Sequence, residues 1–529
     1  MKIIRVVPLL FAISSILNAA DIVEVSATLV PVTHPDASNL SQLELHQQVQ
    51  IARSRGAEDL LKLSSVIESG KWATIKRGRE FFYPGEYSEA KVYRAASDSG
   101  KYSIPEAGIA PGNHSLILPS FPSSTSRTEI GASLQVRPTV KEDGVIYLEG
   151  KFKDTVFEGL SEEAIPVTVE TSQMIRQNRV HPIMSSRIDK AVFRKVEKDF
   201  GVMLPDSPGT SANAKLLRNA KTTYTYFLPV VLGNTAFGAP GKIEMQNSEA
   251  PTGPIRSTMM KATMVRDFFI KPKTEEKAAE QGILILDVKK IENPEPVPSP
   301  NSKRRIYLKS RFIESSVPPS LKVPVMSGDT FNGIVGDLTM KQGSDLLSAP
   351  SVVLDSGTTG KVELVREFIF PTRYIAPALE TVNTGNKFPV TPPVPDVFES
   401  RNIGVSLNVG ATLEANDMIR LKVKSSVVAF EGFIDFGNPV MAVKSGMIKK
   451  LKPNVVHEST VEMPIFPFRN TETELVVPNG SYVAVTMIFD YHNENHQKER
   501  LLKIRKAKVE EVKTPRYLTV FLSPTTIPE

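Results

Sequence analysis

Residues 57–87 read AEDLLKLSSVIESGKWATIKRGREFFYPGEY, and residues 343–374 read GSDLLSAPSVVLDSGTTGKVELVREFIFPTRY. The two stretches are versions of one pattern, and one residue inserted near Pro350 accounts for the slip between them. The shared elements are Asp-Leu-Leu, Ser-Gly, Arg-Glu-Phe, a proline and a tyrosine, which begin at Asp59, Ser69, Arg79, Pro84 and Tyr87 in the first copy and at Asp345, Ser356, Arg366, Pro371 and Tyr374 in the second.

The match resumes further along the chain. Gly131-x-Ser-Leu-x-Val aligns with Gly404-x-Ser-Leu-x-Val, and Phe157-Glu-Gly aligns with Phe430-Glu-Gly. A third match pairs the segment 181–187, with its Pro182, with the segment 463–469, with its Pro464. Because chance does not keep such an order over a long stretch, we interpret the pattern as an internal duplication of a β-rich unit.

Length and composition fit folded domains. The chain has 529 residues, which is enough for two or more domains with their own cores. Hydrophobic residues make up 41%, charged residues 23%, and there are 40 prolines, a profile that favours turn-rich β domains over disorder. The formal net charge of +6 is too small and too dispersed to indicate a nucleic-acid partner.

The N-terminus predicts a signal peptide for export over residues 1–20. Lys2 and Arg5 form a basic start, Val6–Leu17 is mostly apolar, and Ala19-Ala20 offers small residues for cleavage. The alternative is a transmembrane anchor, which the shortness of the apolar run and its two serines disfavour. Cysteine is absent, so disulfides and thiol chemistry are excluded. An exported protein without disulfides fits a bacterial cell envelope.

Each copy is predicted to open with a strand, followed by short helices. Ile22–Val30 and Ile306–Ile313 alternate or nearly alternate apolar and polar residues, as half-buried strands do. Apolar residues at helical spacing within 40–63 and 331–347 indicate short amphipathic helices. The matched Ser-Gly then predicts the turn of a β-hairpin, whose outgoing strand stops at Pro371 in the second copy.

Further strands complete each copy. Gly404–Val409 and Met418–Val423 alternate and are joined by a polar turn at 414–417. Gly282–Val288 is a strong strand that closes the first copy, and Tyr517–Leu522 closes the second.

These signals divide the chain into two tandem units. The proline-rich tract 293–302 predicts a stiff polar linker. The first unit, which is the degenerate one, covers 21–292, and the second covers 303–529. The predicted fold class is α+β and β-dominated, with two related β-domains that carry a few short helices.

The second unit contains an ordered set of motifs. They are Ser348-Ala-Pro-Ser-Val, Ser356-Gly, Arg366-Glu-Phe to Pro371, Ile403–Val409, Met463-Pro-Ile-Phe with Arg469 and Asn479-Gly, and Arg516–Thr525. In this order the unit resembles the C-terminal domain of the secretins, the outer-membrane channel proteins of bacterial type II and type III secretion systems and type IV pili. The first unit keeps part of the set, so both units are predicted to be secretin-like.

The resemblance implies a fold, a location and a role. It implies a non-enzymatic envelope component of a secretin-type machine, in the periplasm or the outer membrane. As a divergent secretin, the protein would form or line an oligomeric ring, through contacts with copies of itself or with other secretion or pilus components. No nucleic acid, cofactor or metal ion is implied.

Two departures favour a different role. The family's VPxLGdiPxlGxLF segment, which lies close to the channel gate, is replaced after Phe489-Asp490 by the charged segment 491–505. The ring-forming modules that commonly precede the channel domain have no plain counterpart. The alternative is therefore a monomeric periplasmic scaffold or binding protein that kept the secretin fold without a pore. A third class, a polymer hydrolase, would need a cleft with two carboxylates at glycosidase-like separation.

No residue set predicts a catalytic, cofactor-binding or metal site. His492 and His496 have the spacing of two ligands on one helix face, but no third ligand has a compelling spacing, so we predict a polar segment. Alternation places Arg79 and Glu80 on opposite faces of a strand, which favours an ion pair or an inter-subunit contact over an acid/base pair. The lysines of 444–452 predict a solvated edge, with contact to anionic lipid or peptidoglycan as the alternative.

Overall fold

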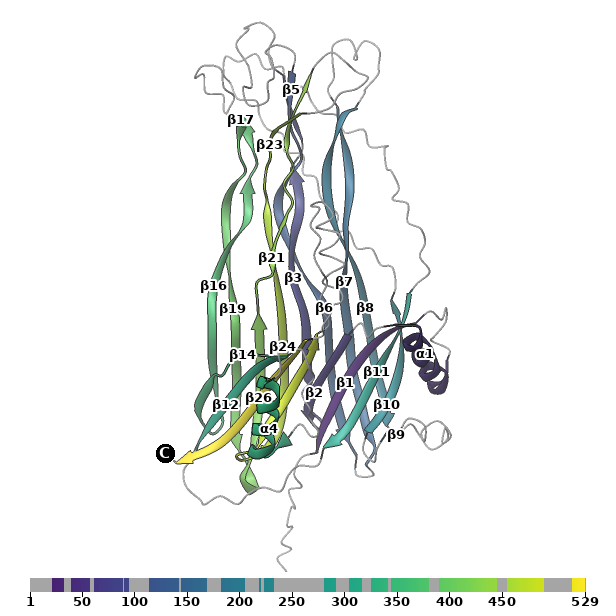
Figure 1. The fold of residues 1–529 in the computed structure, drawn as a ribbon, viewed down its shortest axis with the longest axis vertical. Helices are drawn as coiled ribbons and strands as arrows, with labels where there is room; N and C mark the ends of the chain where they lie inside the picture. The colour runs from purple at the N-terminus through teal and green to yellow at the C-terminus, as the bar shows by residue number, and fades with distance from the viewer. Residues whose placement is uncertain are drawn as a thin grey trace, which may run out of the picture.

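Two large antiparallel sheets make up most of the protein, and they lie face to face in the lower half of Figure 1. The computed structural model describes residues 21–32, 40–57, 61–88, 90–94, 114–141, 144–168, 182–204, 218–219, 223–232, 280–291, 304–315, 325–340, 344–379, 390–444, 454–489 and 516–528. The predicted signal peptide, the linker 293–302 and the charged segment 491–505 lie outside these described residues.

The first large sheet, which we call the long-strand sheet, follows the order β16-β19-β20-β24-β3-β6-β7-β8, with β21 also paired to β24. Its strands are β3 (Ala73–Ser88), β6 (Phe121–Val140), β7 (Ile146–Thr168), β8 (Pro182–Leu204), β16 (Thr358–Ile375), β19 (Val394–Leu413), β20 (Met418–Val428), β21 (Gly432–Asp435) and β24 (Glu462–Pro478). All of its pairings are antiparallel, so neighbouring strands run in opposite directions along the length of the molecule (Figure 1).

The second, the short-strand sheet, follows the order β14-β12-β26-β25-β2-β1-β11-β10-β9, with β13 on β25 and β15 on β12. Its strands are β1 (Ile22–Val32), β2 (Leu61–Glu68), β9 (Arg218–Asn219), β10 (Thr223–Leu232), β11 (Glu280–Ile291), β12 (Arg304–Ser315), β13 (Val325–Met326), β14 (Asp345–Ser348), β15 (Ser351–Asp355), β25 (Tyr482–Phe489) and β26 (Arg516–Pro528).

Smaller elements complete the fold. The strands β4 (Lys91–Arg94), β5 (His114–Leu118), β22 (Val440–Lys444) and β23 (Asn454–His457) form a four-stranded sheet, and β17 (Ala378–Leu379) pairs with β18 (Val390–Thr391). The described helices are α1 (Gln42–Ser54), α4 (Gly328–Met340) and a short 3₁₀ turn at Ala415–Asp417. The predicted β-dominated fold class with short helices is confirmed.

The main core lies between the two large sheets. Every second residue from Ile403 to Ala411 in β19 is buried, because side chains alternate between the two faces of a strand. Opposite this face, β12 of the short-strand sheet contributes Ile306, Leu308 and Phe312 to the same apolar cluster. Each such side chain removed from water contributes about 1.5–3 kcal/mol, so the alternation that predicts the strands also holds the layers together.

Both predicted helices form on the outer face of the short-strand sheet. Ser41 caps α1, and the Glu44 carboxylate accepts a hydrogen bond from the Ser41 backbone N–H, which completes a capping box. Leu45 and Val49 of α1 pack in a cluster with Phe227 of β10. In the other half of the sheet, Phe331 of α4 stacks on Tyr482 of β25, with 4.0 Å between ring centroids.

The Ser-Gly turns do not form the predicted β-hairpins. The strand before Ser69-Gly70, β2, pairs with β1 in the short-strand sheet, whereas the strand after it, β3, pairs with β6 in the long-strand sheet. The same holds for β15 and β16 around Ser356-Gly357. Each turn therefore carries the chain from one sheet to the other. In the first copy, both flanking strands then bury apolar side chains in the core between the layers, among them Val66 of β2 and Ile75 of β3.

One further strand prediction is wrong, because the strand after Ser356-Gly357 does not stop at Pro371: β16 continues to Ile375, and it tolerates the proline as the last strand of the described sheet. The predictions for the later strands are confirmed. β19 and β20 pair antiparallel around the polar turn at 414–417, and the predicted strands at 282–288 and 517–522 lie within β11 and β26. Both β11 and β26 lie inside the short-strand sheet, where each pairs on one side with the strand that opens its half of the chain.

Candidate assembly interface

The long-strand sheet consists of two four-stranded halves joined edge to edge. The first half is β3-β6-β7-β8, and the second half is β16-β19-β20-β24. They meet where β24 pairs with β3, in a ladder from Ile465 opposite Phe81 to Glu472 opposite Thr74. The short-strand sheet is continuous at the same place, because Leu63 of β2 lies opposite Met487 of β25. We call this contact the central junction.

The two halves share one strand register. Gly131 lies opposite Gly78 on one side and Thr155 on the other. Gly404, which aligns with Gly131 in the sequence, lies opposite Val365 and Val428 in the same way. Both glycines have left-handed backbone angles, with φ of 118° for Gly131 and 134° for Gly404. Such angles favour glycine, which explains why both copies carry it at this kink.

The aligned tyrosines make the same tertiary contact. The Tyr87 hydroxyl donates to the Asp189 carbonyl oxygen and accepts from the Asp189 N–H, with both distances 3.1 Å. The Tyr374 hydroxyl makes the same pair of bonds to the backbone of Glu462, at 3.0 and 3.2 Å. Each bond ties the first strand of a half to the last strand of that half.

A cluster of four aromatic rings also occurs twice. One cluster is Phe81, Tyr83, Phe157 and Phe193, and the other is Phe368, Phe370, Phe430 and Phe466. The Phe81–Phe157 centroid distance is 4.5 Å and the Phe368–Phe430 distance is 4.4 Å. Corresponding strands of the two halves therefore present the same residues in the same places.

One sequence match is wrong. The sequence comparison pairs Pro182 with Pro464, but the ladders equate Ala191 with Pro464, because Ala191 lies opposite Leu160 and Pro464 lies opposite Phe433. The short Pro-Ile repeat is a coincidence within a β8 strand that is longer than β24.

Ion pairs cross the central junction. The Arg79 guanidinium of β3 binds the Glu431 carboxylate of the second half through two hydrogen bonds, at 2.6 and 3.5 Å. The next residue, Glu80, is buried and accepts a hydrogen bond of 2.6 Å from Arg401 of β19. Arg79 and Glu80 thus bind two different partners, as the alternation in the Arg-Glu-Phe motif predicts.

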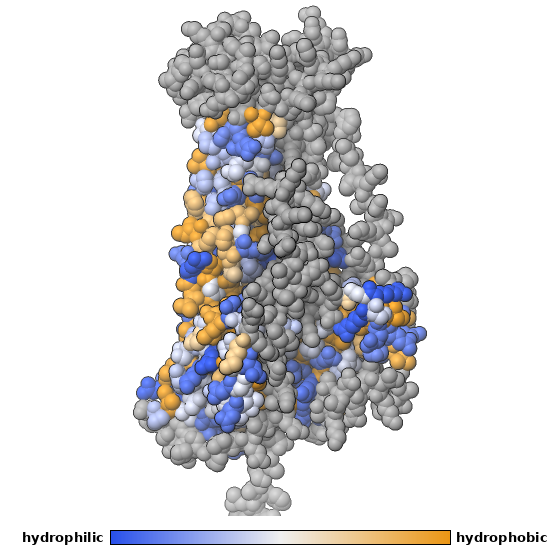
Figure 2. Space-filling view, viewed as in Figure 1, coloured by the Kyte–Doolittle hydropathy of each residue, from blue (hydrophilic) through white to orange (hydrophobic). Residues whose placement is uncertain are grey.

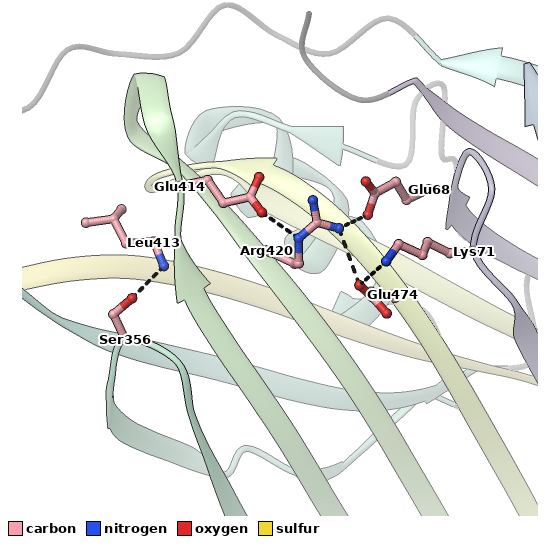
Figure 3. A network of polar contacts seen from close by, with 7 residues as sticks. All are labelled: Glu68, Lys71, Ser356, Leu413, Glu414, Arg420 and Glu474. Atoms are coloured by element: carbon pink, nitrogen blue, oxygen red, sulfur yellow. Dashed lines mark hydrogen bonds and ion pairs between the residues drawn. The ribbon is translucent and has the colours of Figure 1, made fainter. Parts of the chain in front are cut away.

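Arg420 of β20 is the centre of a second charged group at the junction (Figure 3). Its guanidinium donates to Glu414 at 2.5 Å, to Glu474 at 3.3 Å and to Glu68 of the first half. Lys71, also in the first half, lies 3.0 Å from Glu474. Burial opposes the charge of Glu474, but the hydrogen bond and charge of Lys71, together with Arg420, lower the pKa of that carboxyl below its ordinary value.

Sequence analysis misses the Arg420 group. Its members come from three strands and two turns, and no motif contains more than one of them. One signal exists, because an acid, Glu68 or Asp355, stands directly before Ser-Gly in both copies. The Ser-Gly motif itself has a structural role. The Ser356 hydroxyl accepts from the Leu413 N–H at 2.9 Å (Figure 3), and Ser69 does the same for Val140 at 2.9 Å.

Among the strands that the structure describes, each half leaves one edge without a pairing partner. The β8 edge, with β10 beside it in the short-strand sheet, ends the first half, and the β16 edge, with β15 beside it, ends the second. The β16 edge and the adjoining strands β15 and β19 carry exposed apolar residues, and Figure 2 shows an orange band on this left flank. Among them are Ile369 of β16, Val353 of β15, and Val394 and Phe398 of β19.

The residues of the first half that align with Ile369 and Val353 are buried. Ile369 is 65% exposed, whereas Phe82, which takes its place in the first half, is 3% exposed because Phe370 and Phe466 of the second half cover it. Val353 is 46% exposed, whereas the aligned Val66 is 2% exposed. The central junction thus covers positions that the β16 edge presents to solvent.

The described residues hold no cluster of three or more metal-ligating side chains, and none of their helices is long and apolar enough to span a membrane. His492, His496 and most of the lysine group 444–452 lie outside the described residues, so the predictions for them stay predictions.

No protein-family model matches the sequence, and no curated protein matches it. Similar solved structures include the type II secretin of enteropathogenic Escherichia coli, at 11% identity over 43% of this chain and 70% of that chain, with a TM-score of 0.19. The type III injectisome secretin of Salmonella matches at 11% identity over 43% and 66%, with a TM-score of 0.20. The type IV competence pilus secretin of V. cholerae matches at 7% identity over 97% and 63%, with a TM-score of 0.17. Scores this low assign neither a family nor a function to this chain.

Proposed function

We propose that the protein is a divergent secretin, a non-enzymatic envelope component that forms or lines an oligomeric ring in a secretin-type machine. In this proposal, residues 21–292 and 303–529 are two tandem copies of one secretin-like unit. The ordered motifs of the second unit support the secretin assignment. The central junction carries the proposal of a ring, since it is an edge-to-edge contact between two such units, and no described strand pairs with either outer edge.

The physical reason for a ring lies in these edges. A long strand at the edge of a sheet exposes N–H and C=O groups that pair readily with another strand. The two open edges differ, one being β8 and the other β16, so copies would join head to tail. A repeated head-to-tail contact gives a closed ring when its rotation returns to the first copy and an open filament when it does not, and a protein of discrete size requires the ring.

The alternative is a monomeric periplasmic scaffold or binding protein that kept the fold without a pore. The observation in its favour is the charged segment 491–505, which stands where secretins carry the segment near their gate. In that case the open edges would bind a different envelope component.

The test is the mass of the mature protein, extracted from envelopes in mild detergent and measured by light scattering. A discrete species of about ten or more subunits that resists mild denaturant supports the ring. A monomer or dimer in the periplasmic fraction overturns the ring and leaves the scaffold.

A further inference from the structure

We propose that the β8 edge of one copy pairs with the β16 edge of the next copy, in the register of the central junction. This inference rests on the proposed function and names the interface that the ring would use. A second copy of the same chain is the partner, because each chain already contains a contact between the corresponding edges.

The shared registers define which residues would meet. In the central junction, Ile465 lies opposite Phe81 and Glu472 lies opposite Thr74. The residues that take these places on the outer edges are Val192 and Asp199 on β8 and Phe368 and Lys361 on β16. Val192 would therefore lie opposite Phe368 of the next copy, and Asp199 opposite Lys361 of the next copy.

The exposed apolar residues support this pairing. In the central junction, Phe82 lies against Phe370 and Phe466, with ring centroids 5.1 and 6.0 Å apart. The residues in the places of Phe370 and Phe466 on the first half are Tyr83 and Phe193, which already pack together at 5.3 Å. Ile369 of the next copy would cover Tyr83 and Phe193, as Phe82 covers Phe370 and Phe466 in the central junction. This contact would remove the highly exposed Ile369 side chain from water.

The charges are compatible but not identical. Arg366 and Glu158 take the places of Arg79 and Glu431, so the outer contact keeps this arginine and this acid. Glu158 is 37% exposed and already binds Arg194 at 3.2 Å, so it would be shared between two arginines. In the outer junction, Asp355 takes the place of the acid Glu68, and Tyr147 takes the place of Arg420. Lys141, which takes the place of Glu414, would supply the positive charge that Arg420 supplies in the central junction.

A ring built this way would alternate two kinds of contact. Each chain would contribute one central junction and one outer junction, so the number of units around the ring would be even and twice the number of chains. Separation of the central junction would break the bond of buried Glu80 to Arg401 and the bond of Arg420 to Glu68 within one chain. The outer junction would be the one at which the ring assembles.

The experiment uses designed disulfides in the full-length chain, which has no cysteine of its own. In D199C/K361C, oxidation of the assembled protein is expected to give a ladder of covalent multimers on a non-reducing gel. The side chains of Asp199 and Lys361 are 75% and 57% exposed, so neither change should disturb the fold. Each single variant should give no ladder, because head-to-tail pairing places one residue of each kind at every contact.

Two matched variants test the register. E472C/T74C places cysteines at the equivalent pair of the central junction and should form a bond within one chain, without multimers. In D199C/E363C, the cysteine on β16 is two residues away from the position opposite Asp199. This variant should form its disulfide about tenfold more slowly than D199C/K361C, because diagonal positions are too far apart for an unstrained disulfide.

The outcomes separate this inference from the proposed function. A large species by light scattering in which E472C/T74C reacts but D199C/K361C does not would overturn the interface and leave the ring. Dimers from K361C alone would show two-fold pairing of β16 edges and would also overturn it. A monomer that forms no multimers would overturn the interface and the ring together.

Discussion

At the scale of single residues, the aligned tyrosines offer a matched comparison. Each hydroxyl makes two hydrogen bonds to the backbone of a strand in its own half. We expect Y87F and Y374F each to lower the free energy of unfolding by about 1 kcal/mol, with the larger loss in Y87F, because Tyr87 is buried and Tyr374 is not. Urea denaturation measures both values. Equal stability of Y87F and the wild type would mean that this bond is not formed.

Glu474 makes the stability of the central junction depend on pH. The pKa of Glu474 in the folded protein is lower than the ordinary value of 4.5. The folded state therefore stabilises the ionised carboxylate more than the unfolded state does. This contribution is present above pH 4.5 and is lost as the pH falls through the lower folded-state pKa. We expect E474Q to be less stable than the wild type at neutral pH, with a difference that shrinks on acidification.

The measurement is the free energy of unfolding of both proteins from pH 7 down to about pH 3. K71M serves as the matched control, because it removes the cation and should reduce the same pH dependence while it leaves the carboxyl in place. A difference between E474Q and the wild type that stays constant with pH would contradict the assignment.

At the scale of strands, the kink glycines decide whether each long hairpin can form. A Cβ atom on Gly131 would lie 2.3 Å from the Arg77 carbonyl oxygen, and one on Gly404 would lie 2.2 Å from the Leu364 carbonyl oxygen. Backbone atoms cannot move aside as a flexible side chain can, and the positive φ adds strain. We expect G131A and G404A each to destabilise the fold by about 3 kcal/mol or more.

The matched control is G410A in the same strand as Gly404. A Cβ atom there meets nothing closer than 3.4 Å, and its nearest neighbour is the Thr359 side chain. Thermal unfolding should show a large decrease in melting temperature for G404A and a small change for G410A. Similar values for the two variants would contradict the role of the kink.

The strands could be predicted from sequence because alternation is a local signal. The pattern of β19 and β20, the polar turn between them and the repeated glycines are all visible in the sequence. The assignment of strands to sheets is not local. A Ser-Gly turn with apolar residues on both sides fits a hairpin and also a crossing between layers, and only the burial of Val66 and Ile75 in one core decides between them.

The candidate interface was predictable only in part, for a related reason. The Arg-Glu-Phe motif predicts an ion pair at Arg79, but its partner, Glu431, comes from a different half of the chain. Partners far apart in sequence meet only through the edge pairing of β24 with β3, and single-strand patterns carry no information on which edges pair. Arg420 and its three acids were missed for the same reason.

At the scale of the whole molecule, the exposed apolar flank is the surface that the proposed outer junction would cover. Contiguous apolar residues on the surface of a soluble protein commonly mark an interaction site, and here they follow the edge strand β16 and the adjoining β19 and β15. In the first half, the positions aligned with Ile369, Val394 and Val353 are Phe82, Phe121 and Val66, which are 3%, 2% and 2% exposed. The strands that carry them are thus covered in the half that has the other half beside it.

We therefore expect I369K to weaken assembly without changing the stability of the separated chain. Ile369 is 65% exposed, so lysine at this position costs little in a single copy, whereas in an outer junction it would have to be buried beside two aromatic rings. The lost burial of one isoleucine is worth about 1.5–3 kcal/mol, or about a tenfold to hundredfold weaker contact. M340K is the control, because Met340 is 90% exposed at the end of α4, whose buried side packs on Ala484 of β25 and Phe521 of β26 inside the short-strand sheet. Light scattering over a range of concentrations should show smaller species for I369K and unchanged species for M340K, and an unchanged mass for I369K would remove this flank from the interface.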